Sequence, residues 1–115
     1  MPKNFADAFD EIDAIVCTHR SKLVGWGFAN LNISRIDALF VDPIWQRNGF
    51  GSKITRKFEE LAMEQRIDEL ELSSTPNAVA FYEHLGFVSM GQFNYNHLSG
   101  FTLPSVRMLK RLRRR

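Results

Sequence analysis

The chain has 115 residues, of which 44% are hydrophobic and 24% charged, a composition that indicates one folded domain over residues 1–115. Its formal net charge is +2, yet six of the fifteen basic residues lie between Arg107 and Arg115, which leaves nine basic against thirteen acidic residues elsewhere. Nucleic acid is therefore not an expected partner, because such a surface needs basic groups spread along a groove. No run approaches the roughly 18 apolar residues of a membrane span, so no membrane partner is expected either.

Cys17 is the single cysteine of the chain. It cannot form an internal disulfide, and no second ligand stands at metal-binding spacing, so no metal is expected. The acidic N-terminal residues lack the apolar core of a signal peptide. These features predict a protein of a reducing compartment, the cytoplasm.

Three strands are predicted in the first half of the chain. They share runs of β-branched, aromatic or small side chains, at residues 12–17, 23–31 and 35–41. Polar turns at 19–22 and 30–34 separate them, so the first two strands should form a hairpin. Pro43 ends the third strand, because proline cannot donate to a ladder.

The second strand has two unlike faces. Trp26 and Phe28 fall on one face, and Gly25 and Gly27 fall on the other. Missing side chains suit a β-bulge or a close backbone neighbour. We therefore expect one of these two features at the glycine face.

The periodicity changes after Pro43. Apolar residues then recur at helical spacing, which predicts an amphipathic helix from Gly51 or Ser52 to about Arg66. Gly86 should end a second helix in the left-handed conformation. The remaining elements are, in chain order, a strand at 67–72, that helix at 77–85, and strands at 87–95 and 101–112.

This order of elements predicts an α/β (α+β) fold. A meander of antiparallel strands leads into a strand–helix–strand crossover, which gives a mixed, mostly antiparallel sheet flanked by helices. Pro104 in the last strand favours a bulge or an edge position there.

The segment from Val41 to Ser52 joins a strand to a helix through a turn with two glycines. The first N–H groups of a helix have no partner inside it, and the helix dipole adds positive charge, so they can bind an anion. Gly49 and Gly51 would let phosphate oxygens approach the backbone, and Arg47 could reinforce the site. Glycines that only ease a tight turn are the alternative. The segment lacks the lysine of a phosphate loop and the full dinucleotide-binding motif, which disfavours a nucleoside triphosphate or a dinucleotide as the ligand.

The helix at 77–85 supplies the second candidate group. Asn77 and Phe81 are four residues apart and would share a helix face, with Tyr82 one step further round, so an amide and a phenol could project near each other. A core tyrosine that keeps its hydroxyl in water is the alternative. His84 is either a solvated histidine or a general base.

Taken together, the two segments resemble the GNAT superfamily of N-acetyltransferases. The first motif, LxVxP followed by [QR]xxGx[GA], is matched by Leu39, Val41, Pro43, Gln46, Gly49 and Gly51. The second, an asparagine followed by an AxFYexxGF-like segment, is matched by Asn77, Ala80, Phe81, Tyr82, Gly86 and Phe87. Both occur in the right order, and the resemblance runs from about residue 12 to the last strand.

The resemblance implies an acyl-CoA N-acyltransferase-like fold with acetyl-CoA as co-substrate. Its pyrophosphate would rest on backbone amides at the helix start, and its pantetheine arm would pair with the third strand, where the N–H of Val41 would polarise the thioester carbonyl. The residues implied to bind it are Leu39, Phe40, Val41, Gln46, Arg47, Asn48, Gly49, Phe50, Gly51, Ser52, Asn77 and Tyr82.

The resemblance also implies an N-acetyltransferase in which a neutral amine attacks the acetyl carbon directly. Tyr82 would be the acid that protonates the departing sulfur, and Asn77 would hold Tyr82 or the pantetheine in place. The base stays open between Asp37 and a water chain. The acceptor is a small-molecule or peptide amine, and Asp37, Asp42 and Glu83 would attract a cationic one.

The sequence departs from the family at its N-terminus. Family members begin with a strand and two helices that form much of the acceptor wall, whereas about eleven residues here precede the first predicted strand. We therefore expect this part to be lacking or abbreviated and a homodimer to complete it. Two alternatives stay open: a catalytically inactive acetyl-CoA-binding module, and a structural or interaction protein on the same scaffold.

Overall fold

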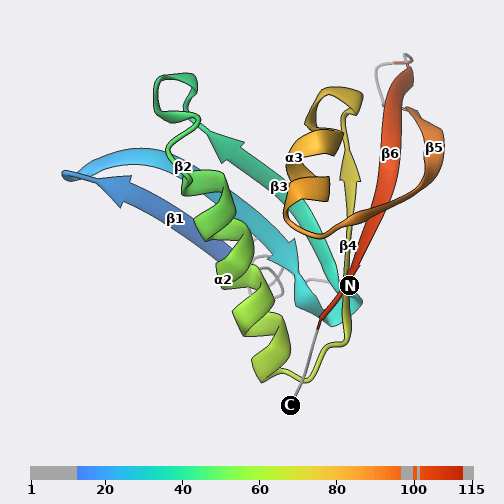
Figure 1. Ribbon diagram of the computed structural model, residues 1–115, viewed down its shortest axis with the longest axis horizontal. Helices are drawn as coiled ribbons and strands as arrows, with labels where there is room; N and C mark the ends of the chain where they lie inside the picture. Colours follow the sequence, from blue (N-terminus) through green and yellow to red (C-terminus); the bar gives the residue numbers. More distant parts are fainter. Residues whose placement is uncertain (1–12, 97–99, 101, 113–115) are drawn as a thin grey trace.

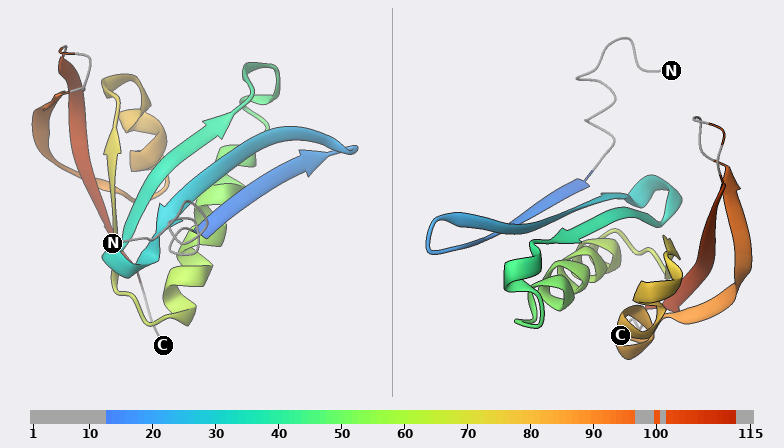
Figure 2. Two further views of the ribbon diagram at one scale, coloured as in Figure 1. Left: turned by 180° about the vertical axis from the view of Figure 1, so that it is seen from behind. Right: turned by 90° about the horizontal axis from the view of Figure 1, so that it is seen from above.

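The computed structural model describes residues 13–96, 100 and 102–112. Within that part, six strands form one sheet in the order β1-β2-β3-β4-β6-β5. Their bounds are β1 (Asp13–His19), β2 (Lys22–Asn30), β3 (Arg35–Val41), β4 (Glu69–Ser74), β5 (Val88–Asn96) and β6 (Thr102–Arg111). The α-helices α2 (Phe50–Glu64) and α3 (Val79–His84) both lie on one face of the sheet, in front of it in Figure 1 and behind it in the left view of Figure 2.

The structure confirms the predicted α+β fold and its order of elements. All neighbouring strands pair antiparallel except β3 and β4, which are parallel, so the sheet is mixed and mostly antiparallel. The predictions for the abbreviated N-terminus, the last hairpin turn and the basic tail fall on residues 1–12, 97–99 and 113–115, outside the described part.

The predicted helix at 77–85 is divided in two. Pro76–Ala78 form a short 3₁₀ helix, η3, and the α-helix α3 begins only at Val79. Gly86 adopts φ +101°, and the N–H of Phe87 donates to the carbonyl of Tyr82 at 3.0 Å. These bonds end α3 with the left-handed glycine that the sequence predicts.

The glycine face of β2 lies against helix α2. A Cβ on Gly27 would stand 2.8 Å from Cε2 of Phe58, and one on Gly25 would stand 3.3 Å from Cδ1 of Ile54. The predicted close backbone neighbour is β3, because a Cβ on Gly25 would stand 2.8 Å from the carbonyl oxygen of Phe40, and side chains of α2 also approach both glycines. Because α2 rests directly on the strand, Ile54 and Phe58 are almost completely buried.

The core lies between the helices and their face of the sheet. Its largest fully buried side chains come from α2, β4 and β6, and include Phe58, Ile54, Leu70, Leu72 and Met108. Leu70 and Leu72 alternate with the more exposed Glu69, Glu71 and Ser73, because successive residues of a strand face opposite sides. The charged residues of β4 therefore lie on the face away from the helices.

Pro104 lies in a strand that is flanked on both sides. Strand β6 lies between β4 and β5, so the predicted edge position is wrong for the strand as a whole. The bulge also lies elsewhere, on β5 between Ser89 and Gly91. Pro104 nevertheless lies beyond the Ser74–Val106 pair, where the pairing of β4 with β6 stops, so its missing N–H breaks no bond to β4.

Aromatic rings cover the opposite face of β1–β3. The ring of Trp26 lies 5.1 Å from that of Phe28 and is stacked on Phe40 at 5.5 Å. Val16 is paired with Trp26 in the register and is 68% exposed. We call Val16, Trp26, Phe28 and Phe40 the aromatic face; within the described part of the chain no helix crosses it (Figure 2).

Candidate active site

The parallel strands β3 and β4 separate toward their C-terminal ends. They pair at Arg35 and Glu71, where the N–H of Glu71 donates to the carbonyl of Ser34 at 2.8 Å. Beyond this pair the two strands diverge, and Figure 1 shows the V that they form. We call this divergence of the two strands the opening.

The backbone of β3 directs polar groups into the opening. The N–H of Asp42 donates to the carbonyl of Val24 at 2.8 Å, so this pair belongs to the ladder with β2. Hydrogen-bonded pairs alternate along an antiparallel ladder, so the N–H and C=O groups of Phe40 also point toward β2. The N–H and C=O groups of Leu39 and Val41 therefore point the other way, into the opening. The side chain of Gln46 donates to the carbonyl of Val41 at 3.3 Å. The N–H groups of Leu39 and Val41 are thus directed at the space where β4 has moved away.

Helix α2 begins beside the opening without a side-chain cap. Its N-cap is Gly49, with φ +82°, a conformation that glycine adopts without steric cost. The side chain of Asn48 could have capped the helix but donates instead to the carbonyls of Trp45 and Gln46. The first-turn N–H groups of α2 therefore have no side-chain partner and can receive an anion.

A cavity of about 540 Å³ lies between β3, the loop before α2, and α3. It is lined by Leu39, Val41, Trp45, Gln46, Arg47, Gly49, Phe50, Gly51, Ser52, Ala78, Phe81 and Tyr82. The structure thus brings nine of the twelve residues expected at the site to one cavity. The two segments singled out in the sequence, residues 41–52 and 77–85, lie on opposite sides of the opening and contribute opposite walls of this cavity.

Three of the expected residues lie away from this cavity. Phe40 belongs to the aromatic face on the other side of the sheet. Asn48 stabilises the loop from outside, and Asn77 is exposed in η3. The predicted proximity of Asn77 to Tyr82 assumed a continuous α-helix, and the 3₁₀ turn at Pro76–Ala78 breaks that spacing.

Trp45, Ala78 and Phe81 line the cavity and were not expected at the site. The ring of Trp45 meets the ring of His19 at 5.2 Å, so the end of β1 supports the wall of the cavity. Nothing in the sequence links residues this far apart. For Phe81 a signal exists in Gly51, because a Cβ there would stand 3.0 Å from Cζ of Phe81.

Tyr82 is the titratable group in the cavity with a shifted pKa. Its ring is half-buried and makes edge contacts with Phe81 at 5.0 Å and Phe87 at 5.8 Å. Burial raises the pKa of the phenol above its usual value, because the charged form is poorly solvated there. At neutral pH Tyr82 is therefore protonated and able to donate.

The candidate acidic and basic groups outside this cavity have other contacts or lie in solvent. Asp37 is ion-paired with Arg35 at 3.3 Å, and Asp42 accepts the N–H of Ile44 at 3.0 Å. Glu83 and His84 are exposed on α3. None of the four lines the cavity.

The described residues contain neither a metal-binding cluster nor a membrane-spanning helix. No group of three or more His, Cys, Asp or Glu side chains is placed to hold a metal ion. None of the helices there is long and apolar enough to cross a membrane.

The fold and the cavity together define the class. A mixed sheet that opens between two parallel strands, beside an uncapped helix, is an acyl-CoA N-acyltransferase-like fold. The family model described as acetyltransferase (GNAT) domain matches residues 2–103. The chain belongs to the GNAT family of acetyltransferases.

The similar proteins span more than this chain does. The uncharacterized protein YyaT of Bacillus subtilis (strain 168) is 25% identical over 118 residues, which cover 95% of this chain and 77% of YyaT. A GCN5-related N-acetyltransferase from Rhodopseudomonas palustris has a TM-score of 0.85 at 22% identity, covering 93% of this chain and 66% of its own. An aminoglycoside 6'-N-acetyltransferase complexed with coenzyme A has a TM-score of 0.70 at 19% identity, covering 91% and 75%. At these identities the structural likenesses show the fold.

Proposed function

We propose that this protein transfers the acetyl group of acetyl-CoA to a primary amine. The observation that carries the proposal is the meeting of three groups in one cavity: the outward N–H groups of β3, the uncapped start of α2 and the protonated phenol of Tyr82. Membership of the GNAT family and the coenzyme A bound by a related aminoglycoside 6'-N-acetyltransferase support it.

In the proposed complex, backbone groups of β3 and of the start of α2 would make most contacts with acetyl-CoA. The pyrophosphate would accept hydrogen bonds from amides between Gln46 and Ser52, with Arg47 adding positive charge. The pantetheine arm would lie in the opening as an added strand beside Leu39 and Val41. The N–H of Val41 would donate to the thioester carbonyl, a contribution of about 3 kcal/mol to stabilising the transition state.

The proposed reaction is a direct displacement. The lone pair of a neutral amine forms a bond to the acetyl carbon, and the carbon–sulfur bond breaks. The sulfur takes the proton of the Tyr82 hydroxyl, and the amine loses its proton to a water chain, since Asp37 is paired with Arg35 and does not line the cavity. The ionised phenol then regains a proton from solvent.

The test is a titration followed by an assay on the same sample. Calorimetry with acetyl-CoA should show binding, and a panel of small-molecule and peptide amines should then release free thiol in proportion to acetylated product. Binding without transfer to any amine would favour the inactive binding module. No binding of either acetyl-CoA or CoA would contradict the proposal.

We also propose that the protein forms a homodimer through its aromatic face. This face exposes Val16 and Phe40 by 68% and 44%, and large apolar patches on a surface mark interaction sites. Light scattering should give twice the chain mass, and Phe40→Glu should give a monomer. Val88→Glu, at an apolar residue of β5 that is 60% exposed, serves as the control. A monomeric wild type would contradict the proposal.

The free thiol of Cys17 suits a reducing compartment. We therefore place the proposed reaction in the cytoplasm.

A further inference from the structure

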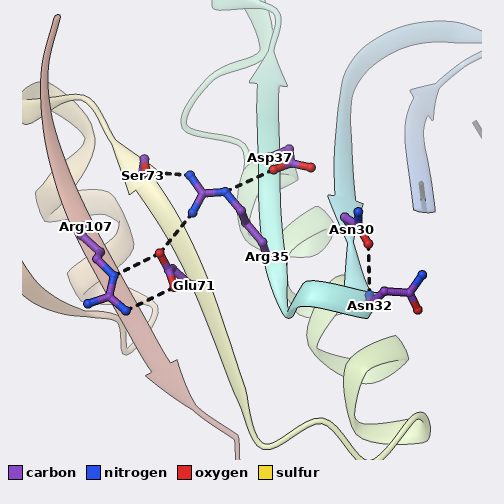
Figure 3. A network of polar contacts seen from close by, with 7 residues as sticks. All are labelled: Asn30, Asn32, Arg35, Asp37, Glu71, Ser73 and Arg107. Carbon is purple, nitrogen blue, oxygen red and sulfur yellow. Dashed lines mark hydrogen bonds and ion pairs between the residues drawn. The ribbon is translucent and has the colours of Figure 1, made fainter. Parts of the chain in front are cut away.

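The side chain of Arg35 bridges β3 and β4 where the two strands begin to diverge. Arg35, at the start of β3, donates from Nη1 to Oε2 of Glu71 at 3.1 Å and from Nη2 to Oγ of Ser73 at 2.8 Å. Its Nε lies 3.3 Å from Oδ1 of Asp37 on its own strand. Figure 3 shows the guanidinium reaching across from β3 to β4 on the face away from the helices.

The bridge lies where backbone pairing of these strands ends. Arg35 and Glu71 are the pair that the two strands form, and Ser73 is two residues further along β4, inside the diverging part. The guanidinium therefore joins β4 at two successive residues of one face, and the second contact extends the connection beyond the ladder. A planar group with fixed donors sets distance and angle together, which a lysine ammonium cannot do.

Glu71 is itself held from the other side. Arg107 of β6 donates to both of its carboxylate oxygens, at 3.0 Å and 3.3 Å. These contacts with Arg107, reinforced by Arg35, lower the pKa of Glu71, so the carboxylate is ionised at neutral pH. Side chains thus connect β3, β4 and β6 in one polar chain across the sheet (Figure 3).

We propose that Arg35 is a positioning residue that fixes the width of the opening. This inference rests on the proposed function, since the groups it positions lie on opposite sides of the opening. Leu39 and Val41 continue from Arg35 along β3, whereas Tyr82 follows β4 through η3. A change in the angle between β3 and β4 moves the N–H of Val41, which donates to the thioester carbonyl, relative to the hydroxyl of Tyr82. A misplacement of about 1 Å can cost on the order of 100-fold in rate.

The expected result separates catalysis from cofactor binding. The start of α2 is joined to β3 by a short loop and lies on the glycine face of β2, so its amides do not depend on the bridge. In Arg35→Met, kcat should fall by about tenfold or more, while the Kd of acetyl-CoA stays within about threefold. Arg35→Lys should be intermediate, because one ammonium reaches Glu71 or Ser73 but does not hold both.

Arg111→Met is the matched control. Arg111 lies on the same sheet face and pairs with Glu69 at 3.5 Å, but it joins β6 to β4, which an uninterrupted ladder already connects. It should leave kcat unchanged. Ser73→Ala, which removes a single bond of the bridge, keeps the test decisive should Arg35→Met fail to fold.

Hydrogen exchange supplies a readout that does not depend on activity. Amides at residues 38–42 and 72–74 should exchange faster in Arg35→Met and Ser73→Ala than in wild type. In Arg111→Met their exchange rates should equal those of wild type. Equal exchange and equal kcat in the Arg35 and Arg111 variants would overturn the inference. If wild type transfers no acetyl group, the exchange result alone decides the role of Arg35, and the failure belongs to the proposed function.

Discussion

The phenol of Tyr82 is the side chain on which the proposed chemistry depends most directly. Its half-buried ring is fixed by Phe81 and Phe87, and burial raises its pKa. A core tyrosine with a solvated hydroxyl would pack in the same way. The two roles differ in what the oxygen does, so a variant that deletes only the oxygen distinguishes them.

Tyr82→Phe keeps the ring and removes the acid. We expect kcat to fall by about 100-fold, the usual range for losing a positioned general acid, and the Kd of acetyl-CoA to change little. Thiol release under saturating acetyl-CoA measures the first quantity and calorimetry the second. Full activity in this variant would show that the sulfur leaves without a proton from Tyr82.

At the scale of elements, the contact between β2 and α2 depends on missing side chains. Gly27→Ala would place a methyl group 2.8 Å from Cε2 of Phe58, 3.1 Å from Cγ2 of Ile54 and 3.2 Å from the carbonyl of Ala38. Backbone cannot yield as a side chain can, so we expect a loss of about 2 kcal/mol in the free energy of unfolding. Urea denaturation measures it.

A double-mutant cycle identifies the cause of that loss. Phe58→Leu alone leaves a cavity, but in combination with Gly27→Ala the smaller side chain makes room for the new methyl group. The double variant should therefore be more stable than the sum of the single effects predicts. Simple additivity would mean that overpacking against Phe58 is not the cause.

Lys110 connects three elements from inside the structure. Its ammonium on β6 donates to both carboxylate oxygens of Glu59 on α2, at 3.0 Å and 3.1 Å, and to the carbonyl of Leu85 after α3 at 2.7 Å. Both charged side chains are mostly buried, being 24% and 15% exposed. The last turn of α3 thus depends on a residue of the final strand.

Lys110→Met should lower the free energy of unfolding by about 2 kcal/mol, because the mostly buried carboxylate of Glu59 and the carbonyl of Leu85 would lose their hydrogen-bond donor. The control is Lys57→Met, which removes an exposed 3.7 Å pair with Glu60 and should cost under about 0.5 kcal/mol. Thermal and urea unfolding of the two variants give the comparison. Equal stability of the two variants would contradict a special role for Lys110.

The sequence predicted most elements because their signals are local. The helical period of α2, the hairpin of β1 and β2 and the glycine stop at Gly86 each depend on neighbouring residues. The 3₁₀ turn before α3 was not predicted, since a proline suits the start of either kind of helix and the structure keeps the N–H of Ala78 on the carbonyl of Thr75.

The site was predicted as far as its two motifs extend. Contacts between distant segments, such as His19 with Trp45 or Arg35 with Ser73, depend on how strands are registered and how far they diverge. Neither quantity leaves a periodic or compositional mark. Trp45 was therefore missed. Within the second motif, Phe81 was missed as a cavity residue, and Asn77 was expected in a cavity that it does not line.

At the scale of the whole molecule, the ion pairs that join Arg35, Glu71 and Arg107 make the free energy of unfolding depend on pH. The pKa of Glu71 is lowered in the folded state, chiefly by its hydrogen bond with Arg107, so its stabilising contribution is present above the ordinary carboxyl pKa. That contribution disappears as the pH falls through the lowered value.

The difference in Tm between wild type and Glu71→Gln should be largest near neutral pH and should shrink as the pH falls through the lowered pKa of the Glu71 carboxyl, where the wild-type side chain becomes neutral too. Scanning calorimetry at a series of pH values measures it. Glu64→Gln, at an exposed residue of α2, is the control. A difference that stays constant with pH would show that shape rather than charge is responsible.

The divergence of β3 from β4 has a mechanical consequence. One lobe consists of β1, β2, β3 and α2, and the other of β4, β5, β6 and α3. Within the described residues, the Arg35–Glu71 ladder pair, the guanidinium of Arg35, the Lys110–Glu59 ion pair and the shared apolar interior connect them. We expect thermal fluctuation to concentrate between the two lobes as a twisting of one against the other, since ladders of several residue pairs connect the strands within each lobe. A ligand bound in the opening would contact both lobes and would restrict this twisting.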